Sequence, residues 1–442
     1  MRIVIVGAGA VGSYLAERLS AEGQDVVVIE SDAERVEELR SSLDALVVHG
    51  NGASPSVLAD VGIEKAGLLI AVTSSDAVNV LVCHAGHRFE VARKIARVED
   101  PALRDELEQL GVDVIIDPGE MLARELLLLV RRGGVSEITE FADGRLVLLG
   151  GHITNDAPVA GITLAELREK VTGWDWIVAA LVRNGDTFVA RGDTTIEEDD
   201  HVLIMAKSDH TEEAIELLGL HEHRAEKVMI LGATRLAELT AALFAENGIN
   251  TVLVDKDAER CRSLAEHSER VVVVQGDPTD PKVLRSEGIE NVDVVLALTG
   301  WDEVNILGSL VAKALGVSTA VARFHQVELV GLLAEAGIDA GVSSRLAAAN
   351  AILRFVRRGR IHSVVTFQDT DAEAIELEVG TDSEAVGRSL IEIALPRSAI
   401  IGGVLRDDEA FVPRGVTVIE AGDRLIVFAL PEAIPKIEKL FA

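Results

Sequence analysis

The sequence predicts an α/β protein with two doubly wound parallel-sheet domains, each followed by a small α+β domain. Three observations carry this prediction. The chain of 442 residues repeats itself at an offset of about 226 residues, which indicates a duplicated domain pair rather than a solenoid. Each half begins with short apolar runs that alternate with helical patterns. Each half ends with β-rich runs that are joined by turn residues.

The repeat keeps polar residues in register. Glu30 in the first half corresponds to Asp255 in the second. Five further pairs have identical residues 226 positions apart, and they are Gly50 and Gly276, Thr73 and Thr299, Asp76 and Asp302, Asn79 and Asn305, and Arg97 and Arg323. The two halves are therefore expected to share one scaffold.

Residues 1–132 are expected to form the first large domain. Its predicted strands are Arg2–Val6, Val26–Glu30, Ala45–Val48, Leu68–Thr73, Ile95–Val98 and Val112–Ile116. The segments between them have helical spacing, with N-cap candidates at Asp32, Ser54 and Asp76. Strands that alternate with helices indicate right-handed βαβ units, and so a Rossmann-like parallel sheet. The run Glu120–Arg132 is expected to be a helix that leaves this domain.

Residues 133–220 are expected to form the first small domain. Val135–Phe141 and Arg145–Leu149 flank the hairpin signal Asp143-Gly144. A short helix, Thr163–Lys170, precedes three more strands with turns at Asn184-Gly185 and Glu197–Asp200. After the polar linker His221–Glu226, the second half repeats both domains as residues 226–358 and 359–442.

The amino-acid composition indicates where in the cell the protein is located and which partners it is not expected to bind. No apolar run approaches the roughly 20 residues that span a bilayer, and the two cysteines cannot form a disulfide framework. A soluble cytoplasmic protein is expected. The net charge of −31 would repel phosphate backbones, so no nucleic-acid partner is expected. Only 10 of the 42 basic residues are lysine, which favours adaptation to high salt, as in a halophile, over an ordinary acidic protein.

A glycine-rich loop is the clearest candidate site. It follows the first strand and opens a helix, so a pyrophosphate would meet the helix N-terminus. Glu30 closes the second strand, at the spacing from the last glycine that is typical of dinucleotide-binding folds, where it would accept hydrogen bonds from ribose hydroxyls. An acid there repels a 2′-phosphate, so NAD(H) or an adenine nucleotide such as ATP or ADP is favoured over NADP(H). The loop residues are Gly7, Ala8, Gly9, Ala10, Val11 and Gly12.

The second copy of this loop is degraded. Thr234 and Ala237 replace two glycines after Gly232, so side chains crowd the phosphate approach, while Asp255 still supplies a ribose acid. The alternatives are a second nucleotide site and a folded relic that completes the architecture.

Other polar residues allow two interpretations each. Thr73-Ser74-Ser75-Asp76 either caps a helix or forms a lip over the adenosine. Arg97 either faces a phosphate or makes a structural ion pair. The double arginines at 131–132 and 357–358 either complement a helix dipole or contact a neighbouring subunit.

Metal and catalytic chemistry are not indicated. Cys83, His84 and His87 are only three candidate ligands without a second cluster, so ordinary packing is favoured over a metal site. The small domains contain no repeated acid–base group of the kind that a dehydrogenase needs.

The four-domain order and these motifs together resemble the TrkA family, the peripheral NAD-binding regulatory subunits of Trk-type potassium uptake systems. The motifs include Ala71-Val-Thr-Ser-Ser-Asp76, Ile95-Ala-Arg-Val98 and Ile419-Glu-Ala-Gly-Asp423. In that family each half has an RCK (regulator of potassium conductance) nucleotide-binding domain and a small RCK C-terminal domain. The resemblance covers essentially the whole chain.

The resemblance implies a homo-oligomeric ring, commonly of four chains, on the inner face of the membrane beneath an integral potassium-conducting subunit. It places nucleotide on residues 7–11, Glu30, Thr73, Ser74 and Arg97. Asn51, where the second copy has Asp277, is a further candidate adenosine contact. The expected function is a non-catalytic ligand switch. The alternatives are a regulator of another cation transporter, such as a cation/proton antiporter, and an NAD-dependent oxidoreductase.

Overall fold

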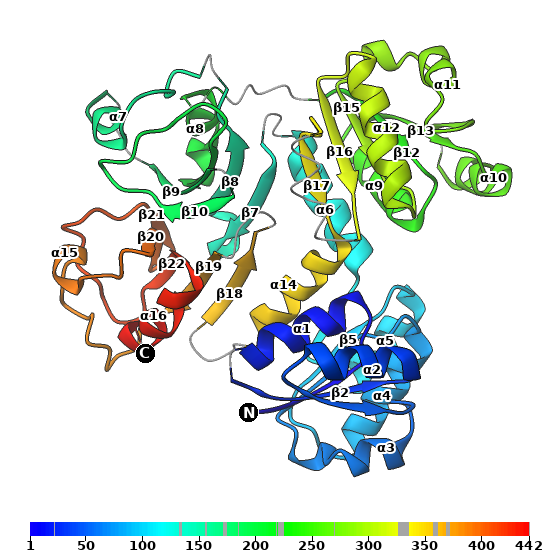
Figure 1. Ribbon diagram of the computed structural model, residues 1–442, viewed down its shortest axis with the longest axis horizontal. Coiled ribbons are helices and arrows are strands. Elements are labelled where there is room, and N and C mark those ends of the chain that lie inside the picture. The colour runs from blue at the N-terminus through cyan, green and yellow to red at the C-terminus, as the bar shows by residue number, and fades with distance from the viewer. Residues whose placement is uncertain are drawn as a thin grey trace. The chain divides into compact units, whose positions relative to one another are not determined.

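The part of the chain that the computed structural model describes contains four sheets (Figure 1). It divides into two compact units, one of residues Met1–Met121 with Ser344–Val356 and one of Leu122–Ser343 with Arg357–Ala442. The four-domain bounds expected from the sequence stay a prediction. The structure describes residues 1–21, 23–131, 135–154, 157–170, 175–183, 185–217, 219, 225–268, 270–325, 336–356, 361–367 and 372–441.

The first large sheet is parallel, with strand order β3-β2-β1-β4-β5-β6. The chain thus starts in the middle, winds outward through β2 and β3, and returns to add β4 to β6 on the other side. This is the predicted doubly wound topology. The strands are β1 (Arg2–Val6), β2 (Asp25–Glu30), β3 (Leu46–His49), β4 (Leu68–Ala71), β5 (Lys94–Arg97) and β6 (Val114–Ile116). The helices are α1 (Ala10–Ala21), α2 (Ala33–Ser42), α3 (Pro55–Asp60), α4 (Asp76–Arg88), α5 (Pro101–Gln109) and α6 (Pro118–Arg131).

Two of the three predicted N-cap residues lie at the N-cap of their helix, and the third is displaced by one residue. Asp32 caps α2 by accepting hydrogen bonds from the N–H groups of Glu34 and Arg35, as expected. Ser54 occupies the N-cap of α3 without a side-chain hydrogen bond. The prediction of Asp76 as the cap of α4 was wrong by one residue, because Ser75 accepts from the Val78 N–H. The Asp76 carboxylate instead accepts from the N–H groups of Glu99 and Asp100.

One helix from the second half of the chain completes the core of the first unit. Successive residues of β1 point to opposite faces of the sheet, and the face that contains Ile3 and Ile5 packs with Leu15 of α1. The same cluster contains Ala348, Ala349, Ile352 and Leu353 of α14 (Ser344–Val356). Figure 1 shows α14 alongside α1. The Arg345 guanidinium lies 5.1 Å from the centre of the Tyr14 ring.

The second large sheet repeats the first, with order β14-β13-β12-β15-β16-β17. Its strands are β12 (Lys227–Leu231), β13 (Asn250–Asp255), β14 (Val271–Gln275), β15 (Val294–Ala297), β16 (Thr319–Arg323) and β17 (Ala340–Val342). Its helices are α9 (Arg235–Glu246), α10 (Ala258–His267), α11 (Pro281–Ser286) and α12 (Asp302–Ala314). The matching topology confirms the duplication.

Each small domain is a five-stranded antiparallel sheet with short helices. The first sheet has β7 (Glu137–Phe141), β8 (Leu146–His152), β9 (Trp176–Arg183), β10 (Asp186–Val189) and β11 (His201–Lys207), with α7 (Leu164–Lys170) and α8 (Thr211–Leu217). The second has β18 (Ile361–Thr366), β19 (Glu373–Glu378), β20 (Ala399–Arg406), β21 (Glu409–Phe411) and β22 (Arg424–Ala429), with α15 (Leu390–Ile393) and α16 (Ile434–Phe441).

A buried ion pair recurs in both small domains. The Arg183 guanidinium donates to both oxygens of Asp200, at 2.6 and 2.7 Å, and the Asp200 side chain is fully buried. Arg406 and Asp423 form the same pair in the second small domain. The acidic turn Glu197–Asp200, which precedes β11, therefore stabilises the fold of the small domain through the ion pair of Asp200.

The two small domains share one apolar core. Phe141, Leu203 and Met205 of the first domain cluster with Ile426 and Phe428 of the second. A Cβ atom on Gly403 would lie 2.6 Å from Leu146 Cδ1, so a larger residue would have to displace the Leu146 side chain. Ion pairs Arg145–Asp408 and Arg424–Asp143, at 3.0 and 3.2 Å, lie at the edge of this contact.

Among the described residues, no helix is long and apolar enough to cross a membrane. Several sequence predictions fall outside the described residues. They are Asn184 of the predicted turn, residues 221–224 of the linker, and Arg132, Arg357 and Arg358 of the double arginines.

Candidate nucleotide site

Two glycines of the first loop are required by backbone packing. Gly7 directly follows β1 and has φ +96°, and a Cβ there would lie 2.9 Å from the backbone of Thr73. A Cβ on Gly12 would lie 1.9 Å from the Gly7 carbonyl oxygen. These two residues therefore allow α1 to start directly against the strand.

Gly9 differs from both. A Cβ built on Gly9 meets no atom within 4 Å, so the backbone at this residue faces open space. Gly9 directly precedes α1, whose first N–H groups have no partner within the helix. The loop thus offers open backbone at a helix N-terminus, which is the arrangement that an anionic phosphate needs.

Glu30 holds the loop from the adjacent strand. Its Oε2 accepts from the Ala8 N–H at 2.7 Å, and its Oε1 accepts from the N–H groups of Ser31 and Asp32 at 2.6 and 2.9 Å. Partial burial opposes ionisation of the carboxyl group, but these backbone hydrogen bonds outweigh it and hold the pKa of Glu30 below its ordinary value. The charged carboxylate therefore lies beside the glycine-rich loop.

Asn79 links the ends of β4 and β5. Its side chain is fully buried. The side-chain oxygen accepts from the Thr73 N–H and hydroxyl, at 3.0 and 2.8 Å. The amide nitrogen donates to the carbonyl oxygens of Thr73 and Arg97, at 3.1 and 2.8 Å. The Thr73 hydroxyl is thus engaged within the fold, whereas Ser74 is exposed.

The two remaining candidates also have internal partners. The Arg97 guanidinium forms an ion pair with Glu99, as its structural interpretation expected. Asn51 is exposed, and its side-chain oxygen accepts from the Ala53 N–H at 2.9 Å. Glu30 and Arg97 end β2 and β5, and Asn51 and Ser74 come shortly after β3 and β4. All four therefore lie at the carboxyl end of the sheet, where ligands bind in open parallel sheets.

The second copy keeps the scaffold, but a side chain occupies the position of the open glycine. Asp255 accepts from the N–H groups of Ala233 and Asp257, at 2.6 and 2.7 Å, as Glu30 does in the first copy. Thr234 replaces the open glycine. Its hydroxyl donates to the Leu298 carbonyl oxygen at 2.8 Å and accepts from the Ala237 N–H at 3.3 Å. A side chain therefore already caps α9 where the first copy leaves backbone open.

The role of Asn79 and its repeat Asn305 was not predicted from the sequence. Asn305 makes the same contacts to Thr299 and to the Arg323 carbonyl oxygen. Their identity at an offset of 226 was the available signal, because a polar residue retained inside a buried helix face usually satisfies buried backbone groups.

The candidate metal ligands lie in different surroundings. Cys83 is buried in an apolar cluster, and burial raises the pKa of its thiol to about 12. His84 and His87 are exposed. Among the described residues, no group of three or more histidine, cysteine or acidic side chains is placed to hold a metal ion.

Two protein families match the chain, and each matches it twice. The TrkA-N domain matches residues 3–118 and 228–344. The TrkA-C domain matches residues 152–219 and 374–442.

Relatives match over the whole length. The Trk system potassium uptake protein TrkA of Halomonas elongata is 35% identical over 451 residues, which cover 100% of this chain and 98% of the relative. The Trk system potassium uptake protein TrkA homolog of Archaeoglobus fulgidus is 36% identical over 445 residues, which cover 100% of both.

Solved structures support the same architecture. The crystal structure of the GsuK RCK domain has a TM-score of 0.63 at 21% identity and covers 100% of this chain and 94% of its own. The GsuK channel bound to NAD has the same TM-score and identity, and the match covers 100% of this chain and 78% of the channel chain. The crystal structure of GsuK bound to ADP has a TM-score of 0.53 at 19% identity, and the match covers 80% of this chain and 69% of the GsuK chain. At these identities the likeness shows the fold, two RCK-type halves in tandem.

Proposed function

Because the chain belongs to the TrkA family of Trk system potassium uptake proteins, we propose that it is the nucleotide-sensing regulatory subunit of such a system. The observation that carries the proposal is the first loop, where Gly9 faces open space beside the preset Glu30 carboxylate. In the second loop Thr234 fills the equivalent position.

The ligand that fits the first site is NAD(H), ATP or ADP. Its phosphates would lie against residues 7–12 and the N-terminus of α1. The ribose hydroxyls would donate to Glu30, and the adenosine would lie near Asn51 and Ser74. Arg97 would reach a phosphate by leaving Glu99. A 2′-phosphate would lie next to the Glu30 carboxylate, whose pKa is already lowered, so NADP(H) would be repelled. The NAD and ADP named for the GsuK structures are consistent with this set.

The second domain would bind nucleotide more weakly than the first. Gly232 and Asp255 keep the turn and the ribose acid. A phosphate at the N-terminus of α9 would have to displace the Thr234 hydroxyl from Leu298 and Ala237. The chain is then an asymmetric sensor with one strong site.

Regulation would follow from a difference in nucleotide affinity between two states of the protein. The ligand would join the ends of β1, β2 and β4 in the first unit, whose core also contains α14. Coupling of about 1–3 kcal/mol per site is typical, and several sites in one ring of chains would steepen the response. The ring, with four chains as the expected number, would lie on the cytoplasmic face against the potassium-conducting subunit.

Calorimetry on the full chain tests the site. Gly9→Asp adds a charged side chain in the phosphate path and should abolish tight binding of NAD and ADP. Gly300→Asp is the matched control, because Gly300 is an equally open glycine that lies after β15 in the second sheet. Unchanged affinity in Gly9→Asp would exclude the assignment.

Co-purification tests the partner. A Trk-type membrane subunit that is retained with the chain, and released by Gly9→Asp or by removal of nucleotide, would support the proposal. Retention of a cation/proton antiporter instead would assign the same switch to another transporter. Steady turnover of NADH would favour an oxidoreductase.

A further inference from the structure

The strand β14 forms a free edge of the second large sheet. Within the described residues it pairs with β13 on one side and is the outermost strand on the other. Its sequence, Val271-Val-Val-Val-Gln275, contains no charged side chain, and Val272 is 58% exposed. An edge strand presents unpaired N–H and carbonyl groups, and natural proteins usually protect it with charged residues or proline. The strand itself contains neither.

Every second residue of β14 directs its backbone away from the sheet. The Gly276 N–H, directly after the strand, donates to the Asp255 carbonyl oxygen of β13 at 2.9 Å. Because the backbone groups of successive residues point to opposite edges of a strand, every second residue counted back from Gly276 also faces β13. The remaining residues, Val271, Val273 and Gln275, direct their N–H and carbonyl groups outward.

The corresponding edge of the first large sheet is protected by an arginine. The Nε of Arg40, in α2, donates to the Val47 carbonyl oxygen of β3 at 3.2 Å. Val47 corresponds to Val273, and Arg40 corresponds to Glu266, each 226 apart. A carboxylate has no hydrogen to donate to a carbonyl group. The second copy has therefore lost the side chain that protects this edge in the first.

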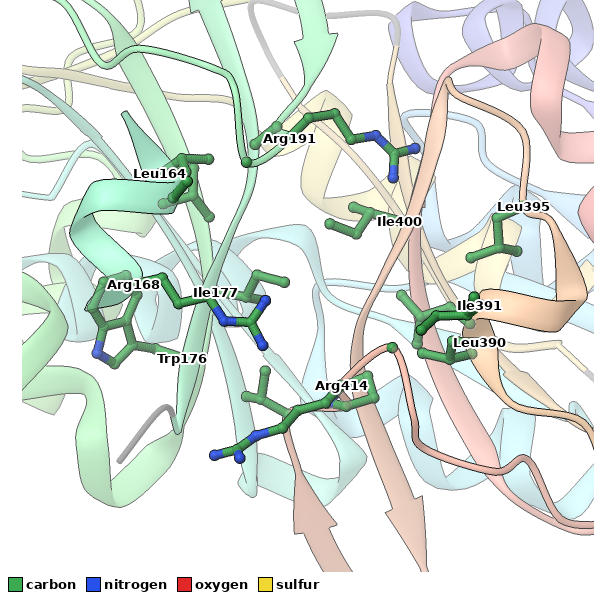
Figure 2. Close-up of a pocket in the computed structure, with 18 residues that line it drawn as sticks. Leu164, Arg168, Trp176, Ile177, Arg191, Leu390, Ile391, Leu395, Ile400 and Arg414 are labelled. Carbon is green, nitrogen blue, oxygen red and sulfur yellow. The ribbon is translucent and has the colours of Figure 1, made fainter. Parts of the chain in front are cut away.

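Arginine also satisfies backbone carbonyl groups elsewhere in this protein. The Arg191 Nη2 donates to the carbonyl oxygens of Pro396, Arg397 and Ala399, at 3.3, 3.0 and 3.0 Å. Figure 2 shows this side chain extending from the first small domain toward the segment that carries Ile400. The change from arginine to glutamate beside β14 thus removes a protection that the protein uses at other places.

The free edge of β14 is complementary to itself. In two antiparallel copies related by a two-fold axis, Val273 would lie opposite Val273, and Val271 opposite Gln275. The outward N–H and carbonyl groups of each copy would then meet those of the other. Arg270, just before the strand, would lie beside Asp277 of the other copy. The contact would therefore add two pairs of opposite charges to the backbone hydrogen bonds.

The first edge does not have this complementarity. Asp44 corresponds to Arg270, and Asn51 corresponds to Asp277, each 226 apart. The same pairing of two first sheets would bring an acid to the place where the second sheet has a base. In a chain of net charge −31, such edges would repel each other.

We propose that β14 is a docking edge for a second copy of this chain, and that two copies join their second large sheets through an antiparallel β14–β14 pair. Strand addition of this kind obtains its affinity from backbone hydrogen bonds. A pair of five-residue strands is a small contact beside the roughly 1,000 Å² that a stable interface buries. The pairing is therefore reversible. It does not rest on nucleotide binding.

Disulfide cross-linking of the full chain tests the register. Opposite Cα atoms of a hydrogen-bonded antiparallel pair lie about 5.5 Å apart, within the roughly 4.4–6.8 Å of disulfides. With diamide as oxidant and about 1 M salt to screen the net charge, Val273→Cys should form covalent dimers at least about tenfold faster than Val272→Cys. Val272 is the more exposed of the two, so random collisions would favour it. Cys83 and Cys261 are buried, and the parent chain supplies the background.

Further changes in the Val273→Cys chain test the backbone and the arginine. Gln275→Pro removes an outward N–H, which an edge strand tolerates, whereas Gln275→Ala keeps it. The proline variant should cross-link about tenfold or more slowly than the alanine variant, because the symmetric contact loses two hydrogen bonds. Glu266→Arg restores the protection of the first edge and should also slow cross-linking. Glu64→Arg, the same charge change at an exposed position of the first domain, should not.

Three results would overturn the proposal. Val272→Cys that cross-links as fast as Val273→Cys would show collision rather than a paired register. Equal rates in Gln275→Pro and Gln275→Ala would leave the backbone groups without a role. Equal rates in Glu266→Arg and Glu64→Arg would mean that the edge is not the docking surface. None of these results bears on nucleotide binding by the first domain.

Discussion

Replacing Asn79 by alanine should loosen the carboxyl ends of β4 and β5, beside the proposed nucleotide site. The side chain is fully buried and makes four hydrogen bonds to Thr73 and Arg97. Each intramolecular hydrogen bond contributes about 1 kcal/mol net, so the variant should lose about 3–4 kcal/mol of local stability. The variant leaves the Thr73 N–H and the carbonyl groups of Thr73 and Arg97 buried without the side chain that satisfied them, so the loss of stability should lie at the upper end of this range.

Native-state hydrogen exchange suits this measurement, because a chain with several domains does not unfold in one step and exchange reports opening region by region. Backbone amides of β4 and β5 should exchange roughly two to three orders of magnitude faster in Asn79→Ala, since about 1.4 kcal/mol corresponds to a factor of ten. Affinity for nucleotide should fall as well, because the Thr73-Ser74 segment loses its anchor.

The duplication supplies the control. Asn305→Ala removes the same contacts in the second copy, so it should accelerate exchange in β15 and β16 and leave β4 and β5 unchanged. Thr73→Ser keeps the hydroxyl group and should have a small effect. A loss below about 1 kcal/mol in Asn79→Ala would refute the reasoning, because it would mean that water satisfies these backbone groups as well as the side chain does.

Three further predictions follow from buried or capping groups. Asp200→Ala removes the buried partner of Arg183, which keeps its contacts to Glu197 and to the Thr195 carbonyl oxygen, and should cost about 1.5–3 kcal/mol, seen as a lower thermal midpoint, whereas the same change at exposed Asp186 should cost little. Burial and the neighbouring His152 lower the pKa of His201 to about 3, so between about pH 6.5 and pH 3 the unfolded chain binds a proton that the folded chain does not. Stability should therefore fall as the pH decreases from 7.5 to 5.5, and an equal fall in His201→Gln would contradict this cause. Thr234→Gly should cost α9 only a few tenths of a kcal/mol and raise nucleotide binding by the second domain; calorimetric stoichiometry checks it, and unchanged affinity would show that Thr234 is not the barrier.

Local structure could be predicted from the sequence where a short range of residues determines it. Arg2–Val6 was predicted to the residue, and Asp32 caps α2 as expected. The glycine pattern also indicated the local difference between the two loops, since Gly9 faces open space and Thr234 is bonded to Leu298, while their difference in nucleotide binding stays a prediction. In each case the chemistry involves residues that are close in sequence or joined by one known motif.

Long-range packing could not be predicted in the same way. The apolar pattern of residues 344–356 indicates a helix with one buried face, but it does not specify which sheet that face covers. The same holds for the shared core of the small domains, where Gly402 and Gly403 look like ordinary strand glycines until Met205 and Leu146 pack against them. The roles of Thr73 and Arg97 depended on Asn79 and Glu99, whose positions only the folded sheet reveals.

The place of α14 in the first unit also has a consequence for synthesis. The sheet that begins with β1 cannot cover its apolar face until Val356 has left the ribosome, long after Met121 has done so. At roughly 5–20 residues per second, this interval lasts about 10–50 s. During that time the surface around Ile3, Leu15 and Val28 is available to chaperones or to other nascent chains. A chain whose synthesis ends before residue 344 would therefore have a first domain that cannot complete this core.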